Sequence, residues 1–358
     1  MDRWRWDVFC RVIDNFGDVG VSWRLCTALA ARGQRVRLWI DDASALAWMA
    51  PQGAPGVTVQ PWDAAAQVQQ PGDVVVETFG AAPPDGFVAR MAAQAQPPVW
   101  INLEYLSAEA YVERSHGLRS PRFSGPGAGL DTWFFYPGFT PATGGLLQHP
   151  PAPTAAAAHA WLAQRGWAPA DGERAVLLFG YDNPALPALL AALTGAPTLL
   201  WLPPGALQSQ VTSQPLPPGL RALPLPWLPQ TDFDHLLAAA DLALVRGEDS
   251  FVRAQLVGHG PVLWQIYPQS DGAHAPKLDA WMDRLLAGSP AALAAAVRRV
   301  QRVLNGLDPA TFDQPLALPD LAAWATQQQR WQAGLHAQAD LVTQLLTFAG
   351  SRMARKSG

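Results

Sequence analysis

The chain has 358 residues, of which 49% are hydrophobic and 15% are charged, and its formal net charge at pH 7 is -4. This length exceeds the roughly 250 to 300 residues at which one hydrophobic core usually stops growing, so we expect two domains. The net charge argues against nucleic acid as a partner, because capture of nucleic acid needs Lys and Arg gathered on one face. An acidic enzyme suits a basic protein partner instead.

The two cysteines carry no predicted chemistry. Cys10 falls in an apolar strand and Cys26 on the helix that follows it. Two cysteines are too few for a disulfide framework or a zinc site, so we expect buried core thiols. The N-terminus has no apolar signal-peptide stretch, and no run approaches the ~20 apolar residues that span a bilayer. We therefore predict a cytoplasmic protein with no membrane partner.

Strands alternate with helices along the first half of the chain. The helix after the first strand carries Val21, Leu25 and Leu29 on one face and ends at Gly33. Such alternation is typical of parallel strands joined by right-handed crossovers. The predicted strands are Trp6 to Ile13, Val36 to Ile40, Asp73 to Phe79 and Val99 to Leu103, with a further helix at Phe87 to Ala95.

A second alternating series follows a boundary rich in Pro and Gly near Pro169 to Gly172. The stretch from Leu202 to Pro229 is dense in Pro, Ser and Gln, and we expect mostly surface loop around one short strand there. Strands are predicted at Ala175 to Gly180, Thr198 to Leu202, Leu220 to Leu223, Leu242 to Val245 and Val262 to Gln265. The predicted helices are Ala155 to Arg165, Pro184 to Leu193, Asp232 to Ala240, Ser250 to Val257, Ala273 to Leu286, Pro290 to Leu304 and Leu321 to Phe348.

These patterns predict an α/β protein with two Rossmann-like domains. Residues 1–170 form the first domain and residues 171–332 the second. The terminal helix, residues 333–358, crosses back onto the first domain. We expect a cleft between the two domains, because ligands of open α/β sheets sit at the carboxyl ends of the strands.

An acidic turn separates the first strand from the first helix. It contains Asp14 and Asp18, four residues apart, with Gly17 between them. The turn lacks both the three glycines of a dinucleotide fingerprint and the Gly-Lys-Ser/Thr of a P-loop, so neither NAD nor ATP is indicated. One interpretation is that a carboxylate here accepts a proton from an incoming nucleophile. The other is that Asp18 caps the helix and Asp14 organises the turn.

A second strand-to-helix turn lies far downstream and runs from Arg246 to Ser250. Free backbone amides and the helix dipole at its end can hold a diphosphate, and Arg246 adds a planar cation. Glu248 and Asp249 would repel phosphate, so they are expected to bond sugar hydroxyls or to orient the arginine. The alternative is a capped, solvent-facing helix start.

Aromatic and polar residues recur at other strand ends. Phe179 and Tyr181 follow one strand of the second half, and Gln230 and Phe233 open a helix. Such a set can hold a base ring between aromatic side chains and bond its edge, although each residue alone is equally explained by packing. The segments Asn102 to Ser107 and Phe135 to Phe139 also follow strands and are candidate acceptor contacts.

Five segments together resemble the bacterial elongation factor P arginine rhamnosyltransferases, known as EarP, over nearly the whole chain. Any one of the segments is a weak signal, but five in the same order are specific. They are Asp14-Asn15-Phe16-Gly17-Asp18-Val19-Gly20, Asn102-Leu103-Glu104-Tyr105-Leu106-Ser107, Phe135-Tyr136-Pro137-Gly138-Phe139, Pro229-Gln230-Thr231-Asp232-Phe233 and Arg246-Gly247-Glu248-Asp249-Ser250.

The resemblance implies a GT-B glycosyltransferase that moves L-rhamnose from dTDP-β-L-rhamnose, with inversion, to an arginine of elongation factor P. Asp18 would be the leading general base, with Asp14 beside it, and Glu248 a third essential acid. No metal or other cofactor is implied. The residues implied to hold the sugar nucleotide are Asn15, Phe16, Gly17, Phe179, Tyr181, Gln230, Phe233, Arg246, Glu248, Asp249 and Ser250.

Two alternatives to this function stay open. One is another GT-B-like enzyme, such as a sugar-nucleotide epimerase or a glycosyltransferase acting on a small molecule. The other is a catalytically silent protein that binds a translation factor. The sequence also leaves open whether Asp14 or Asp18 takes the proton.

Overall fold

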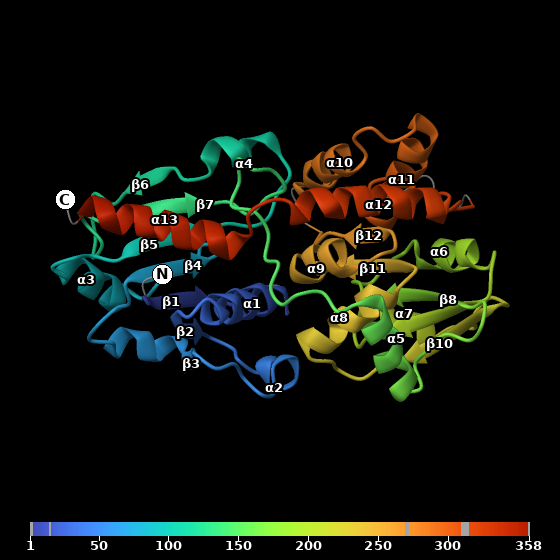
Figure 1. Cartoon of the computed structure of the whole chain (residues 1–358), viewed down its shortest axis with the longest axis horizontal. Helices are drawn as coiled ribbons and strands as arrows, with labels where there is room; N and C mark the ends of the chain where they lie inside the picture. Colours follow the sequence, from blue (N-terminus) through green and yellow to red (C-terminus); the bar gives the residue numbers. More distant parts are fainter. Residues whose placement is uncertain (1–2, 14–15, 269–271, 309–314, 357–358) are drawn as a thin grey trace. The chain divides into compact units, whose positions relative to one another are not determined.

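The structure is a computed structural model that describes the chain except for residues 1–2, 14–15, 269–271, 309–314 and 357–358, and except for the side chains of residues 355 and 356. The chain divides into two compact units (Figure 1). Unit 1 comprises Met1–Pro150 with His336–Gly358, and unit 2 comprises Pro151–Leu335. In the part of the chain that is described, no helix has the length and apolar character needed to cross a membrane.

The chain leaves unit 1 after Pro150, which is earlier than the predicted boundary at residue 170. The intervening helix α5 (Ala155–Gln164) belongs to unit 2 because it packs against α8 (Gln230–Ala239). Thr154 begins α5 by accepting a hydrogen bond from the Ala157 amide at 3.2 Å. The chain then returns to unit 1 at His336.

A seven-stranded sheet forms the centre of unit 1, in the order β3-β2-β1-β4-β5-β7-β6. Neighbouring strands pair in parallel, except that β6 and β7 form an antiparallel pair at one edge. The inner strands are mostly apolar because helices cover both of their faces. The strands are β1 (Arg5–Cys10), β2 (Arg35–Ile40), β3 (Val57–Pro61), β4 (Val74–Thr78), β5 (Val99–Leu103), β6 (Arg119–Pro121) and β7 (Asp131–Phe135).

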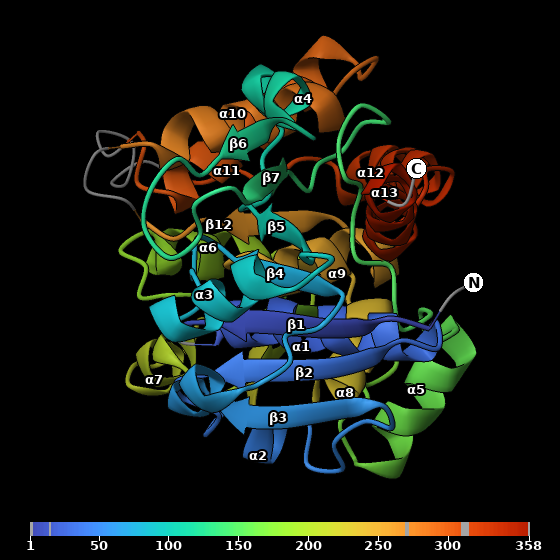
Figure 2. The ribbon, with the colours of Figure 1, turned by 90° about the vertical axis from the view of Figure 1, so that its left-hand side faces the viewer.

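Two hydrophobic layers hold the helices of unit 1 on this sheet. The larger layer joins Val8 and Val76 of the sheet to α1 and α13, with Leu345 of α13 fully buried. The smaller layer centres on Phe9 and Phe87 under α3 and η1. Figure 2 shows α1 and α3 on opposite sides of the strands. The helices are α1 (Gly17–Ala31), α2 (Leu46–Met49), the 3-10 helix η1 (Trp62–Gln67), α3 (Asp85–Ala93), α4 (Ala110–Ser115) and α13 (Leu341–Lys356).

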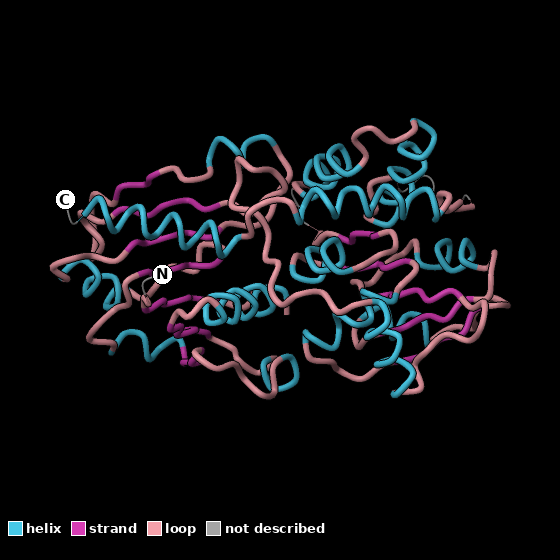
Figure 3. The backbone as a smooth tube through the Cα atoms, in the orientation of Figure 1, coloured by secondary structure: helices cyan, strands magenta, loops and turns pink. Residues whose placement is uncertain are grey.

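Unit 2 has a five-stranded, fully parallel sheet in the order β10-β9-β8-β11-β12 (Figure 3). Its strands are β8 (Arg174–Leu178), β9 (Thr198–Leu202), β10 (Leu220–Pro224), β11 (Leu242–Arg246) and β12 (Val262–Gln265). Its helices, in addition to α5 and α8, are α6 (Leu186–Leu193), α7 (Ala206–Thr212), α9 (Asp249–Val257), α10 (His274–Leu285), α11 (Ala291–Leu304) and α12 (Leu321–His336). The predicted α/β class with two Rossmann-like domains is therefore confirmed.

The prediction of one helix over Leu321 to Phe348 is wrong, because the chain forms α12 and α13 with a break between them. Asp340 begins α13 by accepting a hydrogen bond from the Thr343 amide at 2.7 Å. The stretch from Leu202 to Pro229, predicted to be mostly loop, contains the short helix α7. That helix buries Leu207 and Val211 although most of its other residues are polar.

Candidate active site

Each sheet reverses its strand order beside its first strand. The reversal lies between β1 and β4 in unit 1 and between β8 and β11 in unit 2. Ligands of open α/β sheets bind at such points, outside the carboxyl ends of the strands. The two turns singled out from the sequence directly follow β1 and β11, so each lies at the point of reversal in its own unit.

Asp18 lies in the first turn of α1 and is 3% exposed. Its Oδ2 accepts a hydrogen bond from the Ile13 amide at 2.8 Å, which holds the acidic turn against the helix start. Phe16, rather than Asp18, occupies the N-cap position of α1, and its ring meets Trp48 edge to face with centroids 5.2 Å apart. Asp18 therefore orders the turn through a backbone amide without capping the helix.

Of the other members of the predicted turn, the structure describes Gly17 but not Asp14 or Asn15. Gly17 is the first residue of α1 and is partly exposed. Asp14 and Asn15 lie outside the described residues, so the roles predicted for them stay predictions.

Buried hydroxyl groups fasten the start of α1 to the sheet. Ser22 Oγ and Thr78 Oγ1 are 3.1 Å apart, and Thr78 Oγ1 donates to the Phe9 carbonyl at 2.7 Å. Burial raises the pKa of the neighbouring Cys10 thiol to about 12, so this group stays neutral. Cys10 and Cys26 are both buried and free, as predicted. The helix that carries Asp18 is thus fastened to the buried sheet.

A second polar group lies at the ends of β4 and β5 in unit 1. Asn102 Nδ2 donates to Glu104 Oε1 at 2.8 Å, and Asn102 Oδ1 accepts from the Gly80 amide at 3.3 Å. Glu77 of β4 pairs in register with Asn102, and burial raises the pKa of Glu77 to about 7. The sequence interpretation included Asn102 and Glu104 but missed Glu77. The sequence signal for Glu77 was an acidic residue at the end of the apolar run Val74 to Val76.

In unit 2 the structure brings together four of the predicted residues. The Arg246 guanidinium lies over the ring of Phe179, with Cζ 4.8 Å from the centroid, and over the ring of Tyr181 at 5.0 Å. Phe233 meets Phe179 at an angle of 63°, with centroids 5.3 Å apart. A planar cation therefore lies against an aromatic group at the carboxyl ends of β8 and β11.

The N-termini of α8 and α9 lie beside this aromatic group and are tied to one another. Gln230, the first residue of α8, donates from Nε2 to Asp249 Oδ2 at 2.9 Å. Deeper in the unit, Arg253 and Asp234 form a two-pronged ion pair with contacts of 2.7 and 3.2 Å, and both side chains are almost fully buried. Removing one partner of such a pair leaves an uncompensated buried charge, so the pair fixes the spacing of the two helices.

Glu248 and Ser250 flank Asp249 at the start of α9. Glu248 occupies the N-cap position without a side-chain cap, and its carbonyl accepts the Val252 amide at 2.9 Å. Both side chains are partly exposed. The turn before them is set by Gly247, which has φ +62° and whose carbonyl accepts from Trp264 Nε1 at 2.8 Å. These contacts present the helix start without using the Glu248 carboxylate as its cap.

Gln265 is a supporting residue that the sequence interpretation missed. It ends β12, and its Oε1 accepts the Tyr181 amide at 2.9 Å while its Nε2 donates to the Asp182 carbonyl at 3.3 Å. It thereby fixes the segment that carries Tyr181. A polar residue closing the apolar run of β12 was the available signal.

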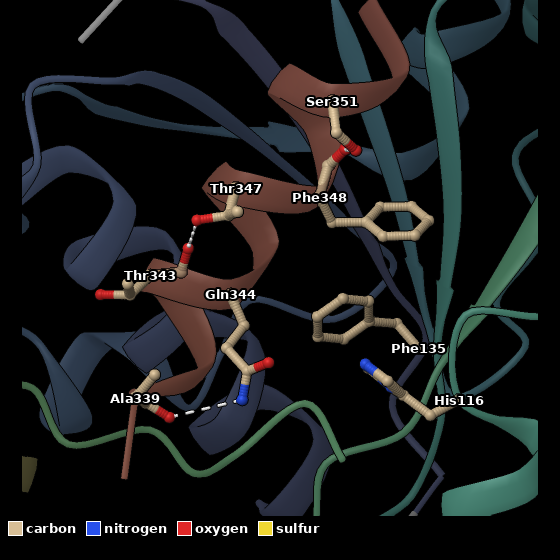
Figure 4. A pocket seen from close by; sticks show the side chains of 8 residues that line it. All are labelled: His116, Phe135, Ala339, Thr343, Gln344, Thr347, Phe348 and Ser351. Atoms are coloured by element: carbon tan, nitrogen blue, oxygen red, sulfur yellow. Dashed lines mark hydrogen bonds between the residues drawn. The ribbon is translucent and has the colours of Figure 1, made fainter. Parts of the chain in front are cut away.

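A separate pocket of about 390 Å³ lies within unit 1, beside α13 (Figure 4). The His116 ring meets Phe135, and its Nδ1 accepts the Tyr136 amide at 3.2 Å. Burial lowers the pKa of His116, which favours the neutral ring in this arrangement. Phe135, the first residue of a segment predicted to contact the acceptor, lines this pocket, but no residue predicted to be catalytic or to hold the sugar nucleotide does. Its lining residues are His116, Phe135, Ala339, Thr343, Gln344, Thr347, Phe348 and Ser351.

Phe16, Gly17 and Asp18 belong to unit 1, and the other described members of the predicted site belong to unit 2. That the two sets meet across a cleft stays a prediction. Within the described ranges, no three or more His, Cys, Asp or Glu side chains form a group able to hold a metal ion.

Comparison with known proteins identifies relatives along nearly the whole chain. Residues 6–350 match the family described as "Elongation-Factor P (EF-P) rhamnosyltransferase EarP". Protein-arginine rhamnosyltransferases of Pseudomonas aeruginosa and Pseudomonas putida are 38% and 40% identical to this chain, with 96% of this chain and 98% of each relative covered.

Solved structures agree with this relationship. A structure that concerns EarP-mediated arginine glycosylation of translation elongation factor EF-P is 27% identical and superposes with a TM-score of 0.62 over 98% of this chain and 99% of that one. The calicheamicin glycosyltransferase CalG4, at 17% identity, has a TM-score of 0.54 over 98% of this chain and 99% of its own. The fold is that of the GT-B glycosyltransferases, and the chain belongs to the EarP family of elongation factor P rhamnosyltransferases.

Proposed function

We propose that this protein transfers L-rhamnose from dTDP-β-L-rhamnose to a guanidine nitrogen of one arginine in elongation factor P, with inversion at the anomeric carbon. The observation that carries the proposal is the group in unit 2, where Arg246 lies over Phe179 and Tyr181 beside the start of α9. Aromatic rings suit a nucleoside base, and a cation next to a helix N-terminus suits a diphosphate. The family match over residues 6–350 is the reason for proposing rhamnose as the sugar and elongation factor P as the acceptor.

The donor is assigned to unit 2 residue by residue. Phe179, Tyr181 and Phe233 hold the thymidine portion, and Gln230 bonds its polar edge. Arg246, the amides at the start of α9 and the Ser250 hydroxyl take the diphosphate or ribose. The Gln230–Asp249 bond supports this assignment, because it holds the base-binding and ribose-binding sides at a fixed separation.

The acceptor presents a chemical difficulty, because a guanidinium loses its proton only above a pKa of about 12. Prior deprotonation by a carboxylate is therefore strongly uphill at neutral pH. Asp18, with Asp14 beside it, instead pairs with the guanidinium and localises its charge away from the reacting nitrogen. The bond from that nitrogen to the anomeric carbon then forms as the bond from the anomeric carbon to the diphosphate oxygen breaks. The carboxylate accepts the proton that the nitrogen releases.

Glu248 and the leaving group complete the proposed scheme. The departing dTDP carries the developing negative charge, which Arg246 and the amides at the start of α9 stabilise. Glu248 bonds the sugar hydroxyls or the incoming guanidinium and so fixes the approach of the two reactants. Attack from the face opposite the diphosphate gives inversion. No metal is assigned a part, and the modified factor is expected to help ribosomes through consecutive prolines.

The function is tested by incubating the protein with dTDP-β-L-rhamnose and elongation factor P and measuring the intact mass of the factor. We expect a gain of one deoxyhexose, lost when the acceptor arginine is changed to lysine and unaffected by EDTA. NMR of the product should show the anomeric configuration opposite to that of the donor. Consumption of dTDP-rhamnose without any gain in mass would favour an epimerase or a small-molecule glycosyltransferase. Binding to the factor without turnover would indicate a silent binding protein.

A further inference from the structure

Glu104 is a partly buried carboxylate at the carboxyl end of β5 that the proposed mechanism does not use. Asn102 Nδ2 fixes its Oε1 at 2.8 Å. Burial raises its pKa, and hydrogen bonds from Asn102 and from the Tyr105 amide oppose that rise. The ionised form of Glu104 is therefore only partly solvated, so a bound cation would stabilise its charge.

Two tyrosine rings lie near Glu104, whose amide donates to the Phe135 carbonyl at 3.0 Å, next to Tyr136. Tyr111 and Tyr136 meet edge to face, with centroids 5.8 Å apart and planes at 89°. Burial raises the pKa of both phenols, that of Tyr136 to about 12, and the Glu104 carboxylate raises each further. Both phenols thus lie within the field of Glu104. Tyr111 is 41% exposed, so this group is open to solvent on one side.

A second acid lies behind Glu104. Glu77 is 3% exposed and lies beside the indole of Trp100 on the neighbouring strand. Burial is the main cause of its raised pKa, Arg122 lowers that pKa, and the Glu104 carboxylate raises it. Glu77 pairs in register with Asn102, whose side chain bonds Glu104, so the two acids lie at neighbouring strand ends. Two acids and two phenol rings are the components of a site for a guanidinium or an ammonium ion.

We propose that Glu104, Tyr111 and Tyr136 form a subsite for a basic side chain of the acceptor protein other than the arginine that is modified. The proposal rests on the proposed function. In this subsite the Glu104 carboxylate pairs with the cation, the tyrosine rings contact its apolar or charged faces, and Glu77 strengthens the negative field from behind. The subsite would raise affinity and fix the register of the acceptor without taking part in bond formation.

The sheet geometry separates this subsite from the reacting centre. Asp18 follows β1, whereas Glu104 follows β5, and β4 lies between those two strands. Neighbouring strands are spaced by about 4.8 Å, which puts β1 and β5 about 10 Å apart. The two carboxylates thus belong to strand ends that are not neighbours in the sheet. A second basic side chain, carried by the same acceptor, satisfies Glu104 while the modified arginine is at Asp18.

The test is steady-state kinetics of Glu104→Gln with elongation factor P from the same organism and dTDP-rhamnose. Glutamine keeps an oxygen for the Asn102 bond and removes only the charge. We expect the KM for elongation factor P to rise about tenfold, because the variant loses its charged partner for the bound cation, and that change corresponds to about 1.4 kcal/mol. The kcat and the KM for dTDP-rhamnose should stay near the wild-type values, and the dependence of acceptor KM on salt should weaken.

Two further variants guard against a folding defect. Tyr111→Leu removes a partly exposed ring and should also raise the acceptor KM with kcat preserved. Asp63→Asn makes the same change of charge at an exposed position of η1 and should leave every kinetic constant unchanged. Thermal midpoints of all three variants should match the wild type within a few degrees.

Acceptor variants identify the bound side chain. Each basic residue of elongation factor P near the modified arginine is changed to glutamine in turn, and one of them should raise KM for the wild-type enzyme but not for Glu104→Gln. An unchanged KM in Glu104→Gln and Tyr111→Leu would overturn the subsite, and so would a loss confined to kcat, which would place Glu104 at the reacting arginine. If the wild-type enzyme transfers no deoxyhexose, the proposed function itself fails.

Discussion

At the level of single residues, Asp18 combines a structural contact with a proposed catalytic one. One of its oxygens accepts the Ile13 amide, so the carboxylate is oriented by the same turn that presents it. A side chain held in this way loses little conformational freedom when it meets a guanidinium. Its burial also reduces competition from water for the incoming cation.

Asp18→Asn separates these two contributions. Asparagine still offers an oxygen to the Ile13 amide but neither carries charge nor accepts the proton. We expect the transfer rate to fall by at least about 100-fold, within the range for loss of a general base, while dTDP affinity stays within about twofold. Single-turnover mass spectrometry measures the first quantity and calorimetry the second. An equal loss of both would assign Asp18 a purely structural role.

Glu77 makes the stability of unit 1 dependent on pH. Burial raises its pKa from the ordinary value of 4.5 to about 7 in the folded protein, so the folded state holds this proton more tightly than the unfolded state. Its contribution to folding is then most favourable below about pH 4.5 and becomes less favourable as pH rises toward 7. The full effect is at most about 3.5 kcal/mol, since each unit of pKa shift corresponds to about 1.4 kcal/mol.

Glu77→Gln should remove this dependence. We expect the variant to match the wild type in thermal midpoint near pH 5 and to exceed it near pH 8, because the wild type must then keep a buried charge. Differential scanning calorimetry across this range, with Asp63→Asn as an exposed control, measures the difference. A gap between the variant and the wild type that is constant across pH would show that Glu77 does not titrate there.

The residue level also shows where sequence reasoning stops. Arg246, Phe179 and Phe233 can be identified from the sequence, because each lies at a strand end or at the start of a helix, where α/β proteins bind ligands. Glu77 and Gln265 were missed because they lie inside or at the end of apolar runs, where side-chain type alone does not distinguish a buried polar contact from a strand boundary. Only the pairing of the strands shows what they face.

At the level of elements, α8 and α9 are tied together at the proposed nucleotide site. The Arg253–Asp234 pair fixes their spacing in the interior, and the Gln230–Asp249 bond joins their N-termini. The segment after β8 completes this site. It is held through Gln265, so its geometry depends on how closely β8 and β12 approach their shared neighbour β11.

Gly180 makes that close approach possible. A Cβ at this position would meet Gln265 Oε1, Leu207 Cδ1 at 2.6 Å and Leu244 Cδ2 at 2.8 Å. We expect Gly180→Ala to displace Gln265 from the Tyr181 amide, to lower dTDP affinity about tenfold and to destabilise unit 2 by roughly 1 to 3 kcal/mol, the usual cost of overpacking. Fluorescence titration with dTDP and thermal unfolding measure the two effects.

The matched control for this substitution is Gly195→Ala, also in unit 2, where a Cβ meets nothing within 4 Å. It should leave dTDP affinity and stability near the wild-type values. Unchanged affinity in Gly180→Ala would show that the Tyr181 segment does not support the nucleotide.

The strands of unit 2 were predicted closely, because a short apolar run between turn residues is a strong local signal. The break between α12 and α13 was not, because His336 to Asp340 contains neither Gly nor Pro. The break depends on tertiary contacts instead. The Leu341 amide donates to the Leu146 carbonyl, and Gln338 Nε2 donates to the Phe139 carbonyl at 3.1 Å. Both acceptors, Leu146 and Phe139, lie in the N-terminal part of unit 1.

At the level of the whole molecule, the two units differ in how they use the chain. Unit 2 is one continuous segment, whereas unit 1 is completed by the C-terminal residues. Leu345 and Ala349 of α13 are fully buried in the larger hydrophobic layer of unit 1, and Arg32 pairs with Asp340 at 2.5 Å. The sequence predicted two domains and a terminal helix that crosses back onto the first, and these contacts place α13 within the core of unit 1.

This difference predicts how fragments of the protein behave. Residues 151–335 contain the whole of unit 2, including every described residue proposed to hold dTDP except Phe16 and Gly17. We expect this fragment to fold alone, to unfold cooperatively and to bind dTDP in a calorimetric titration, but to transfer no rhamnose. Residues 1–150 alone should aggregate or stay partly unfolded, because removing α13 exposes the apolar face of the sheet that Leu341, Leu345 and Ala349 cover.

Linking residues 1–150 to 336–358 through a short flexible segment should restore a folded unit 1. Circular dichroism and size-exclusion chromatography distinguish the two forms of this fragment. A well-folded 1–150 fragment would contradict the role given to α13. A folded 151–335 fragment that fails to bind dTDP would mean that most of the affinity comes from unit 1, since the residues assigned to the base and the diphosphate would all be present without effect.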